Sequence, residues 1–286
     1  MPFLAAFAGV GMLSLMDAFM KGASLAAGAY SAAVLRAALA FAIAAPLWLA
    51  LGGRWPTRAV LKLHLLRGTV SAFMALLFFY ALTKLAIAEA IAISFVAPLI
   101  ALYLAALLLG ERIKRKAILA SLLGFVGTLV IIGGRVGRGG MSEDAWLGLA
   151  AILVSAVLYA WNFVIIRQQS QVAGPTEVAM FHGGVSTLAL GIGAPWFLTI
   201  PAAEVFGGLA ASALLTVGGA MALAWAYARE ETQALVPIES SGFLWAMLFG
   251  WLFFAEKVTA TTLGGTTLIV IACWIAARRR TEQTAV

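Results

Sequence analysis

The chain has 286 residues, of which 63% are hydrophobic and only 11% are charged. A water-soluble protein of this length needs more charge to cover its surface, so this composition excludes an ordinary soluble enzyme or binding module. The formal net charge of +7 does not indicate a nucleic-acid partner, because the basic residues stand at the ends of apolar runs. Cys273 is the single cysteine, which excludes an intrachain disulfide. We predict an integral membrane protein.

Apolar runs long enough to cross a hydrocarbon core of about 30 Å recur along the whole chain. We interpret all of them as helices, because a lone strand would leave its backbone groups unpaired in lipid. The first run lacks a basic start and a small-residue cleavage site, so we expect it to be retained as a span. The ten predicted spans cover residues 3–21, 28–51, 67–83, 87–109, 116–133, 145–166, 176–198, 205–228, 233–254 and 259–277.

The basic residues orient these spans. An even number of spans places both termini on one side, and we assign that side to the cytoplasm. Thirteen Lys and Arg residues then fall in cytoplasmic segments, and five fall in outer segments: Lys21, Lys84, Arg135, Arg138 and Lys257. Positive charge accumulates on the cytoplasmic side of membrane proteins. We therefore predict a multi-pass protein of the bacterial cytoplasmic (inner) membrane with both termini inside.

One pattern occurs twice, as "LLLGERIKRK" at 107–116 and as "LFFAEKVTAT" at 252–261. Glu111 and Glu256 are 145 residues apart, and five predicted spans separate their surroundings. An odd number of crossings turns the second copy over, so its loop faces outward and carries a single basic residue instead of four. Further matches at the same offset are Asp17 with Asn162, Tyr80 with Trp225 and Ser94 with Glu239, and Arg36 matches His182 with a slip of one residue.

These matches predict two five-helix repeats of inverted topology, residues 1–138 and 139–286. Inverted repeats are typical of transporters, whose substrate site lies near the bilayer midplane between the halves. The expected fold is therefore an all-α integral membrane protein of ten transmembrane helices, which would expose a central cavity alternately to each side.

Several motifs carry a resemblance to a known family. Pro98 in the fourth span, the Gly110–Glu111 pair, the basic block at 112–116 and Gly127 follow one another. This order of motifs resembles the EamA-like, ten-helix branch of the drug/metabolite transporter superfamily. Lys21 and Arg36 also resemble residues of that family at the corresponding places. The resemblance spans the whole chain and implies export of small metabolites; aromatic amino-acid exporters are among the members it resembles. Phe243 stands where the second repeat would carry its proline, and Pro237 lies six residues earlier.

Ionisable residues within spans are costly in lipid and therefore face the bundle interior or water. Asp17 lies four residues before Lys21, so the two could form an ion pair at the headgroups, or Asp17 could line the cavity. Glu239 and Ser240 follow Pro237, which favours either an irregular helix along a wet cavity or a hydrated helix end. Three acids at predicted helix starts are expected to cap helices: Glu89, Glu111 and Glu256.

Aromatic residues recur at matching depths of the two repeats. They could be interface anchors, or they could form the walls of a site for a flat, apolar ligand with a polar head. Asn162, Ser94 or Glu239 would then be available for the zwitterion of an amino acid. The predicted substrate-binding residues are Asp17, Phe79, Tyr80, Ser94, Tyr159, Trp161, Asn162, Trp225, Tyr227, Glu239 and Ser240.

The sequence has no phosphate-binding loop and no H-E-x-x-H motif, so we expect no cofactor, no metal and no catalytic site. We predict an exporter of aromatic or hydrophobic amino acids or similar small metabolites, whose partners are that small molecule and the bilayer; a monomer and a homodimer both remain open. One alternative is a proton-coupled exporter of lipophilic cations that uses Glu239 or Asp17. Another is an integral-membrane enzyme acting on lipid or sugar precursors, for which the chain offers no convergent nucleophile and base.

Overall fold

The computed structural model describes residues 1–109, 115–136, 142–169, 171–227, 229, 238 and 241–277, and within these ranges every regular element is a helix. Six of the helices are long and apolar enough to cross a membrane (α1, α2, α3, α6, α7 and α10), and the shorter α12 and α13 are also apolar. The prediction of an all-α chain with membrane-spanning helices is therefore confirmed for the described residues. The helices in chain order are α1 (Pro2–Ala27), α2 (Ala29–Ala50), α3 (Arg58–Lys84), α4 (Ile87–Ser94), α5 (Ala97–Leu109), α6 (Arg115–Val136), α7 (Glu143–Gln169), α8 (Pro175–Gly191), α9 (Ala194–Phe197), α10 (Ala203–Tyr227), α12 (Gly242–Phe254) and α13 (Ala260–Ala277).

Two predicted spans are discontinuous. The span at 87–109 divides into α4 and α5 just before Pro98, which has no N–H to donate to the carbonyl of Ser94. The thiol of Cys273 in α13 donates to the carbonyl of Phe95 at this break, over 3.4 Å. The span at 176–198 divides into α8 and α9 in the same way. The break before Pro98 lies inside the bundle, where another helix satisfies a freed carbonyl, whereas the α8–α9 break is largely exposed and the Tyr30 hydroxyl donates to the carbonyl of Leu190 there.

The third helix begins earlier than its apolar run predicts. Thr57 caps α3, its hydroxyl accepting from the N–H of Val60 over 3.5 Å, so the helix starts at Arg58 rather than near residue 67. Residue 64 therefore does not lie in a connector, although it falls between the predicted spans 28–51 and 67–83. His64 stands inside α3 and is 1% exposed, because helical neighbours bury its ring.

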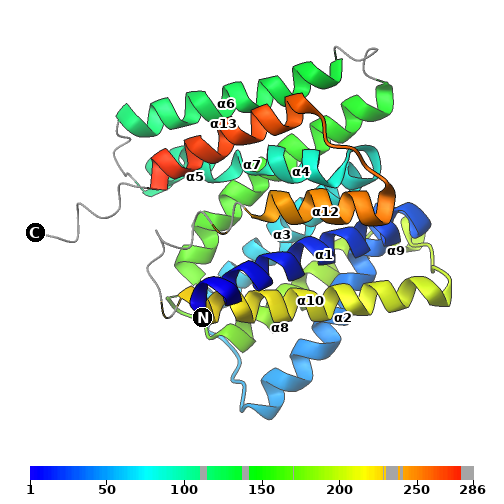
Figure 1. Cartoon of the computed structure of the whole chain (residues 1–286). Coiled ribbons are helices and arrows are strands. Elements are labelled where there is room, and N and C mark those ends of the chain that lie inside the picture. The colour runs from blue at the N-terminus through cyan, green and yellow to red at the C-terminus, as the bar shows by residue number, and fades with distance from the viewer. Residues whose placement is uncertain are drawn as a thin grey trace, which may run out of the picture.

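Four helix pairs make the most extensive contacts: α1 with α10, α3 with α7, α2 with α8, and α6 with α13. In Figure 1, α6 and α13 lie side by side at the top of the bundle, and α1 lies along α10 below. The short helix α4 packs between these pairs, and seven of its eight residues are buried. The core therefore surrounds α4 rather than separating into two independent bundles.

Glycines set the approach of α6 to α13. A Cβ atom on Gly127 would lie 2.6 Å from the carbonyl oxygen of Gly265, and Gly265 faces Gly127 in the same way. A Cβ atom on Gly124 would meet Leu99, whereas one on Gly264 would meet open space. Gly124, Gly127 and Gly265 thus stand at close helix contacts, whereas Gly264 does not.

The start of α1 and the end of α13 lie at the same end of the bundle, at the left in Figure 1. We call this the terminal end, and we call the opposite end the far end. Because the helices run back and forth between them, the α1–α2, α3–α4 and α12–α13 connections all lie at the far end.

Candidate functional site

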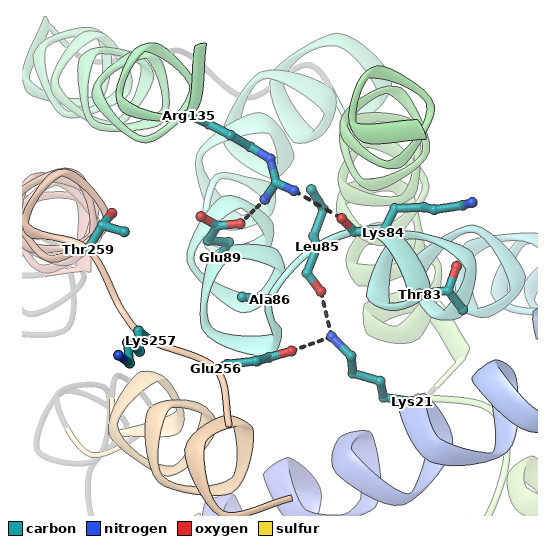
Figure 2. A pocket seen from close by; sticks show the side chains of 10 residues that line it. All are labelled: Lys21, Thr83, Lys84, Leu85, Ala86, Glu89, Arg135, Glu256, Lys257 and Thr259. Atoms are coloured by element: carbon teal, nitrogen blue, oxygen red, sulfur yellow. Dashed lines mark hydrogen bonds and ion pairs between the residues drawn. The ribbon is translucent and has the colours of Figure 1, made fainter. Parts of the chain in front are cut away.

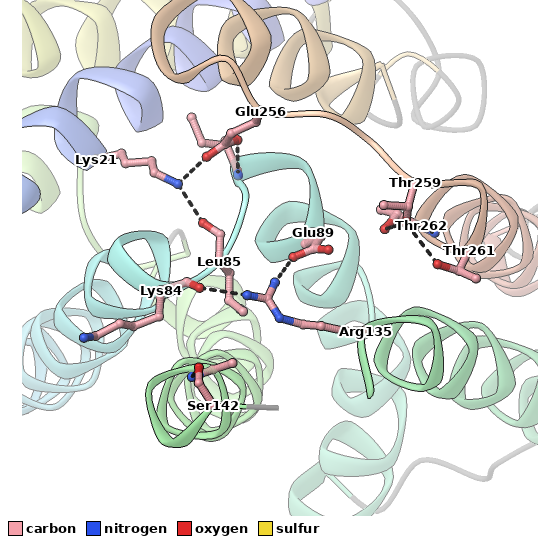
Figure 3. Close-up of polar contacts among 12 residues, drawn as sticks. Lys21, Lys84, Leu85, Glu89, Arg135, Ser142, Glu256, Thr259, Thr261 and Thr262 are labelled. Atoms are coloured by element: carbon pink, nitrogen blue, oxygen red, sulfur yellow. Dashed lines mark hydrogen bonds and ion pairs between the residues drawn. The ribbon is translucent and has the colours of Figure 1, made fainter. Parts of the chain in front are cut away.

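A buried ion pair joins three segments at the far end. The ammonium group of Lys21, at the end of α1, contacts the Glu256 carboxylate and donates to the carbonyl of Leu85 over 2.7 Å. The other oxygen of Glu256 accepts from the backbone N–H of Ile87, at the start of α4, over 2.8 Å. Figure 3 shows this arrangement between the α12–α13 connector and the two helices. The side chains of Lys21 and Glu256 are only 8% and 14% exposed, so the pair is largely shielded from water.

The local sequence directs Glu256 toward this contact. Ala255 adopts a left-handed conformation with φ of 51° and ends α12, after which the N–H of Glu256 donates to the carbonyl of Gly250 over 3.1 Å. Any side chain at Gly250 would collide with the returning carboxylate. Glu256 therefore caps α4, and the prediction that it caps the helix after it is wrong. Thr259 caps that helix, α13, instead.

A second ion pair lies beside the first. Arg135 of α6 contacts the Glu89 carboxylate in the first turn of α4 and donates to the carbonyl of Lys84 over 3.0 Å. Lys84 in turn pairs with Asp144 of α7 over 2.7 Å. Glu89 thus stands at the helix start where the sequence placed it, with an arginine partner that the sequence did not indicate.

The two ion pairs form the floor of an open pocket of about 460 Å³. Figure 2 shows Lys21, Glu89, Arg135 and Glu256 meeting around the connection between α3 and α4. The carboxylates and cations of the floor are already paired with one another, which leaves Lys257 as the lining cation without an ion pair among the described residues. We interpret this far-end network, defined as Lys21, Glu89, Arg135 and Glu256, as a closure between helices.

A separate charged cluster lies within the bundle. Asp17 of α1, Arg36 of α2 and His182 of α8 come from helices that pack together, since α2 contacts both α1 and α8. The guanidinium carbon of Arg36 lies 5.2 Å from the centroid of the Phe79 ring, a cation–π distance. All three polar side chains are partly exposed although they lie at mid-helix positions. The alternative of an Asp17–Lys21 ion pair is wrong, because Lys21 pairs with Glu256.

This interior cluster lacks internal hydrogen bonds. The Nε atom of Arg36 and the Nδ1 atom of His182 are buried and find no hydrogen-bond partner within the described part of the chain. No ion pair of 4.0 Å or less joins Asp17 to Arg36 among the described residues. The sequence contained one indication of this meeting, the slipped match of Arg36 with His182, but it did not predict that the two interact.

A third polar network joins helices at the terminal end. His64 accepts from Gln169 of α7 at Nδ1 over 2.7 Å and contacts Glu177 of α8 through Nε2 over 2.8 Å. Since Nδ1 accepts, Nε2 carries the proton and donates to Glu177. Arg67 donates to the other end of the Gln169 amide, and the Phe181 ring stacks on His64 at 4.5 Å. These contacts fix the terminal ends of α3, α7 and α8 to one another.

The candidates on α7 fall on different faces of that helix. Asn162 is buried and accepts a hydrogen bond from Ser71 over 3.1 Å. Tyr159 lies one turn before Asn162 on the same face, and its ring stacks on Phe163 with centroids 4.5 Å apart. Trp161 lies one turn beyond Val157 on the exposed face. Tyr159 and Trp161 are exposed to the same extent, 37% and 38%, so the two aromatic candidates differ in the face of α7 that they occupy and not in burial.

The aromatic candidates on α3 and α10 separate in a similar way. Trp225 is 42% exposed, lies one turn after exposed Met221 and carries the Arg229 guanidinium 4.1 Å above its ring. Tyr80 is half-buried at the edge of the core, whereas Phe79 is buried beneath Arg36. The structure does not bring Trp161 and Trp225 together, since α7 and α10 are not among the packed helix pairs.

The remaining candidates lie elsewhere. The hydroxyl of Ser94 donates to the carbonyl of Ala90 over 2.9 Å, within its own helix. The side chain of Tyr227 falls outside the described residues, and so do Glu239, Ser240 and Glu111. In the described ranges no three His, Cys, Asp or Glu side chains come close enough to hold a metal ion.

An all-helical chain with several membrane-crossing helices and unpaired charges inside the bundle is typical of a membrane transporter. Comparison with protein families identifies which one. The EamA-like transporter family model matches residues 1–133 and again 146–278, and the chain belongs to this family, a member of the drug/metabolite transporter superfamily. The predicted family membership is confirmed.

Curated relatives of the chain are bacterial transport proteins. The pseudopaline exporter CntI of Pseudomonas aeruginosa is 28% identical, with coverage of 91% of this chain and 90% of that protein. A riboflavin transporter of Brucella anthropi is 26% identical over 81% and 82% of the two chains. The aromatic amino acid exporter YddG of Ancylobacter novellus is 33% identical over 35% of each. A solved crystal structure aligns with 98% of both chains at a TM-score of 0.65 and 20% identity, which shows a shared fold.

Proposed function

We propose that the protein is a ten-span transporter of the bacterial inner membrane that exports amino acids, aromatic or hydrophobic ones above all, or similar small metabolites by alternating access. Its two halves, residues 1–138 and 139–286, would be five-span repeats inserted in opposite orientations. Both termini, and with them the terminal end, would face the cytoplasm. The observation that carries this proposal is that the family model matches each half of the chain separately.

Helix packing supports the repeat. If the second half repeats the first, α7 corresponds to α1 and α10 corresponds to α3. The pair α1–α10 is then the counterpart of the pair α7–α3, and both pairs pack extensively. The pairs α2–α8 and α6–α13 each join a helix to its own counterpart, and both are in close contact. This is the set of contacts expected of two bundles related by a twofold axis in the membrane plane.

The interior cluster lies where that axis would pass. Arg36 and His182 match between the repeats and lie on α2 and α8, which are counterparts and pack on each other. Asp17 and Asn162 match as well, and both stand at inner positions of their helices. A transporter of this type holds its substrate near the midplane, so we place the site at Asp17, Arg36, Phe79 and His182.

The far-end network supplies one gate of this mechanism. In the structure it joins α1, α4 and the α12–α13 connector, which closes the far end. Opening to the outside would require these ion pairs to separate and become hydrated. The terminal-end network around His64 would stay intact in that state and hold α3, α7 and α8 together.

A transport assay tests the proposal directly. Purified protein would be reconstituted into liposomes loaded with a deproteinised bacterial metabolite extract, and release would be followed by mass spectrometry. Faster release of particular metabolites than from protein-free liposomes is expected. Equal release of every metabolite from both preparations would refute the transport function.

A labelling experiment tests the topology. Single cysteines replacing Arg54 and Lys257 would be introduced into a Cys273→Ser background in sealed bacterial cells. A membrane-impermeant thiol reagent should modify position 257 in intact cells and position 54 only after permeabilisation. Labelling of both positions from the same side would refute the inverted repeat while leaving transport itself untouched.

Proton coupling is a second candidate, favoured by one observation. The Asp17 carboxylate lies inside the bundle without a salt bridge among the described residues, as a proton-exchanging acid would. Release would then accelerate under an imposed pH gradient in the native protein and lose that dependence in Asp17→Asn. If the rate of release by the native protein does not change under the pH gradient, proton coupling is excluded.

A further inference from the structure

A groove opens at the far end of the bundle, between α10 and α12. Its volume is about 380 Å³, and residues from the end of α1, the start of α10 and the end of α12 line it. Helix α1 packs on both α10 and α12, whereas α10 and α12 are not among the packed pairs of described helices. In Figure 1, α1 accordingly runs between the other two. Helix α1 therefore forms the floor of the groove, and α10 and α12 form its sides.

A glycine keeps this groove open. A Cβ atom on Gly208 of α10 would lie 3.7 Å from the Phe19 ring of α1, which is an ordinary van der Waals distance. Further along the same helix pair, toward the terminal end, a Cβ atom on Gly219 would lie only 2.9 Å from the carbonyl oxygen of Gly9. Helices α1 and α10 are therefore in tight contact at Gly219 and leave more room at Gly208.

Aromatic rings form one wall of the groove. The rings of Phe19 on α1 and Phe253 on α12 have centroids 6.0 Å apart, and the Phe254 ring lies beside Phe253 with centroids 6.5 Å apart. Phe253 is 48% exposed, so this wall is open to the surroundings of the bundle. In a bilayer, a hydrocarbon chain is the group that covers such a surface favourably.

One carboxylate stands at the mouth of this apolar groove. Among the described residues that line it, Glu204 is the one that carries a charge. It lies exposed in the first turn of α10 and forms no ion pair within the described ranges, and the nearby Lys21 is already paired with Glu256. Helix α10 has 25 residues and is about 38 Å long, which exceeds the hydrocarbon core of about 30 Å. Glu204 therefore lies at headgroup level, and the groove continues from it one turn deeper to Gly208.

We propose that the groove binds a membrane phospholipid whose headgroup carries a primary ammonium group. The ammonium group contacts Glu204, and the adjoining acyl chain lies along Phe19 and Phe253. Charge complementarity selects this occupant, because the carboxylate repels a headgroup of net negative charge and a quaternary ammonium has no N–H to donate to it. A small soluble cation would leave the aromatic wall uncovered. The inference goes beyond the proposed transport function, since it requires only that the protein lies in a bilayer.

Native mass spectrometry tests this proposal. The delipidated protein in detergent would be titrated with phosphatidylethanolamine, phosphatidylcholine or phosphatidylglycerol of identical acyl chains, and the apparent affinity for the first bound lipid would be measured. We expect phosphatidylethanolamine to bind about fivefold more tightly than either of the others, the size expected of a partly exposed charged contact. Equal affinities for the three lipids would overturn the proposal.

Two pairs of variants locate the site. Glu204→Gln should remove the preference for phosphatidylethanolamine, whereas Glu143→Gln should keep it, because Glu143 is an exposed acid in the first turn of α7 that does not line the groove. Gly208→Leu fills the groove and should also remove the preference. Gly207→Leu, on the same helix but facing open space, is its matched control and should bind lipid as the native protein does.

Thermal unfolding would verify that each variant is folded, and Glu204→Gln alters only an exposed side chain. A preference that survives both Glu204→Gln and Gly208→Leu would place the lipid elsewhere and overturn the assignment. Tighter binding of tetraphenylphosphonium than of phosphatidylethanolamine, lost in Glu204→Gln, would make the groove a site for lipophilic cations instead. A dimer that dissociates in Gly208→Leu would make it an interface between two copies. None of these results depends on release from liposomes, so failure of the transport function would leave this inference standing.

Discussion

The Lys21–Glu256 ion pair allows the gate at the far end to be tested quantitatively. Replacing Glu256 by Gln keeps the size of the side chain but removes the charge that faces Lys21 and the start of α4. Removing one partner of a buried ion pair costs about 3 to 5 kcal/mol. We take the lower value, because 14% of the Glu256 side chain is exposed. In an open far end both groups would be hydrated, so the loss falls on the closed state alone.

A loss of about 3 kcal/mol shifts the ratio of closed to open molecules roughly a hundredfold toward open. The reporter is a cysteine at Ala90, which is fully buried one turn below Ile87, in a Cys273→Ser background. Its rate of modification by an impermeant thiol reagent should rise in proportion to the open fraction. Lys21→Met should produce a similar increase.

Two comparisons make this prediction refutable. Lys257→Gln removes the neighbouring exposed charge and should leave the labelling rate unchanged. The double charge reversal, Lys21→Glu with Glu256→Lys, should restore closure only in part, because a lysine beside the start of α4 is unfavourable there. If Glu256→Gln labels no faster than the Lys257→Gln control, the ion pair does not hold the far end closed.

Three further predictions concern positions away from the gate. Gly265→Ala should destabilise the protein by about 1 to 3 kcal/mol through a clash with α6, whereas Gly264→Ala, which meets open space, should be neutral or slightly stabilising in thermal unfolding; equal melting temperatures would contradict the glycine contact. Tyr159→Ala should lower the initial rate of substrate release severalfold and Trp161→Ala should not, and the reverse order would place the aromatic wall on the other face of α7. His64→Ala should lower the melting temperature because it removes two hydrogen bonds and a buried ring, and an unchanged melting curve would show that this network does not hold the terminal end.

Much of the fold was accessible from the sequence because lipid imposes a local rule. Each stretch of chain either is or is not apolar enough to be buried in hydrocarbon, and backbone hydrogen bonding then requires a helix. The helices, the approximate bounds of most spans and the family follow from this rule and from the motif around Pro98. The predicted spans differ from the structure at local exceptions. The cap at Thr57 starts α3 earlier than its apolar run does, and two predicted spans are each broken into two helices.

The partners of charged residues depended on distant parts of the chain. The 145-residue spacing from Glu111 drew attention to Glu256. Its partner Lys21, however, lies 235 residues away in the chain, and the contact requires the left-handed turn at Ala255. In the same way, residue type and repeat matching selected Asp17 and Asn162. They did not show that Arg36 would be left without an acceptor beside His182.

The sequence by itself determined that this chain belongs in a membrane, as helices, and that its two halves share a pattern, because hydropathy and basic flanking residues act within each segment separately. Only the tertiary structure decided which face of each helix is turned inward and therefore which charges meet. Helix approach joins Lys21 to Glu256, and it leaves the Nε atom of Arg36 without a hydrogen-bond partner in the described part of the chain. Those relations depend on several helices at once, and no single stretch of sequence contains them.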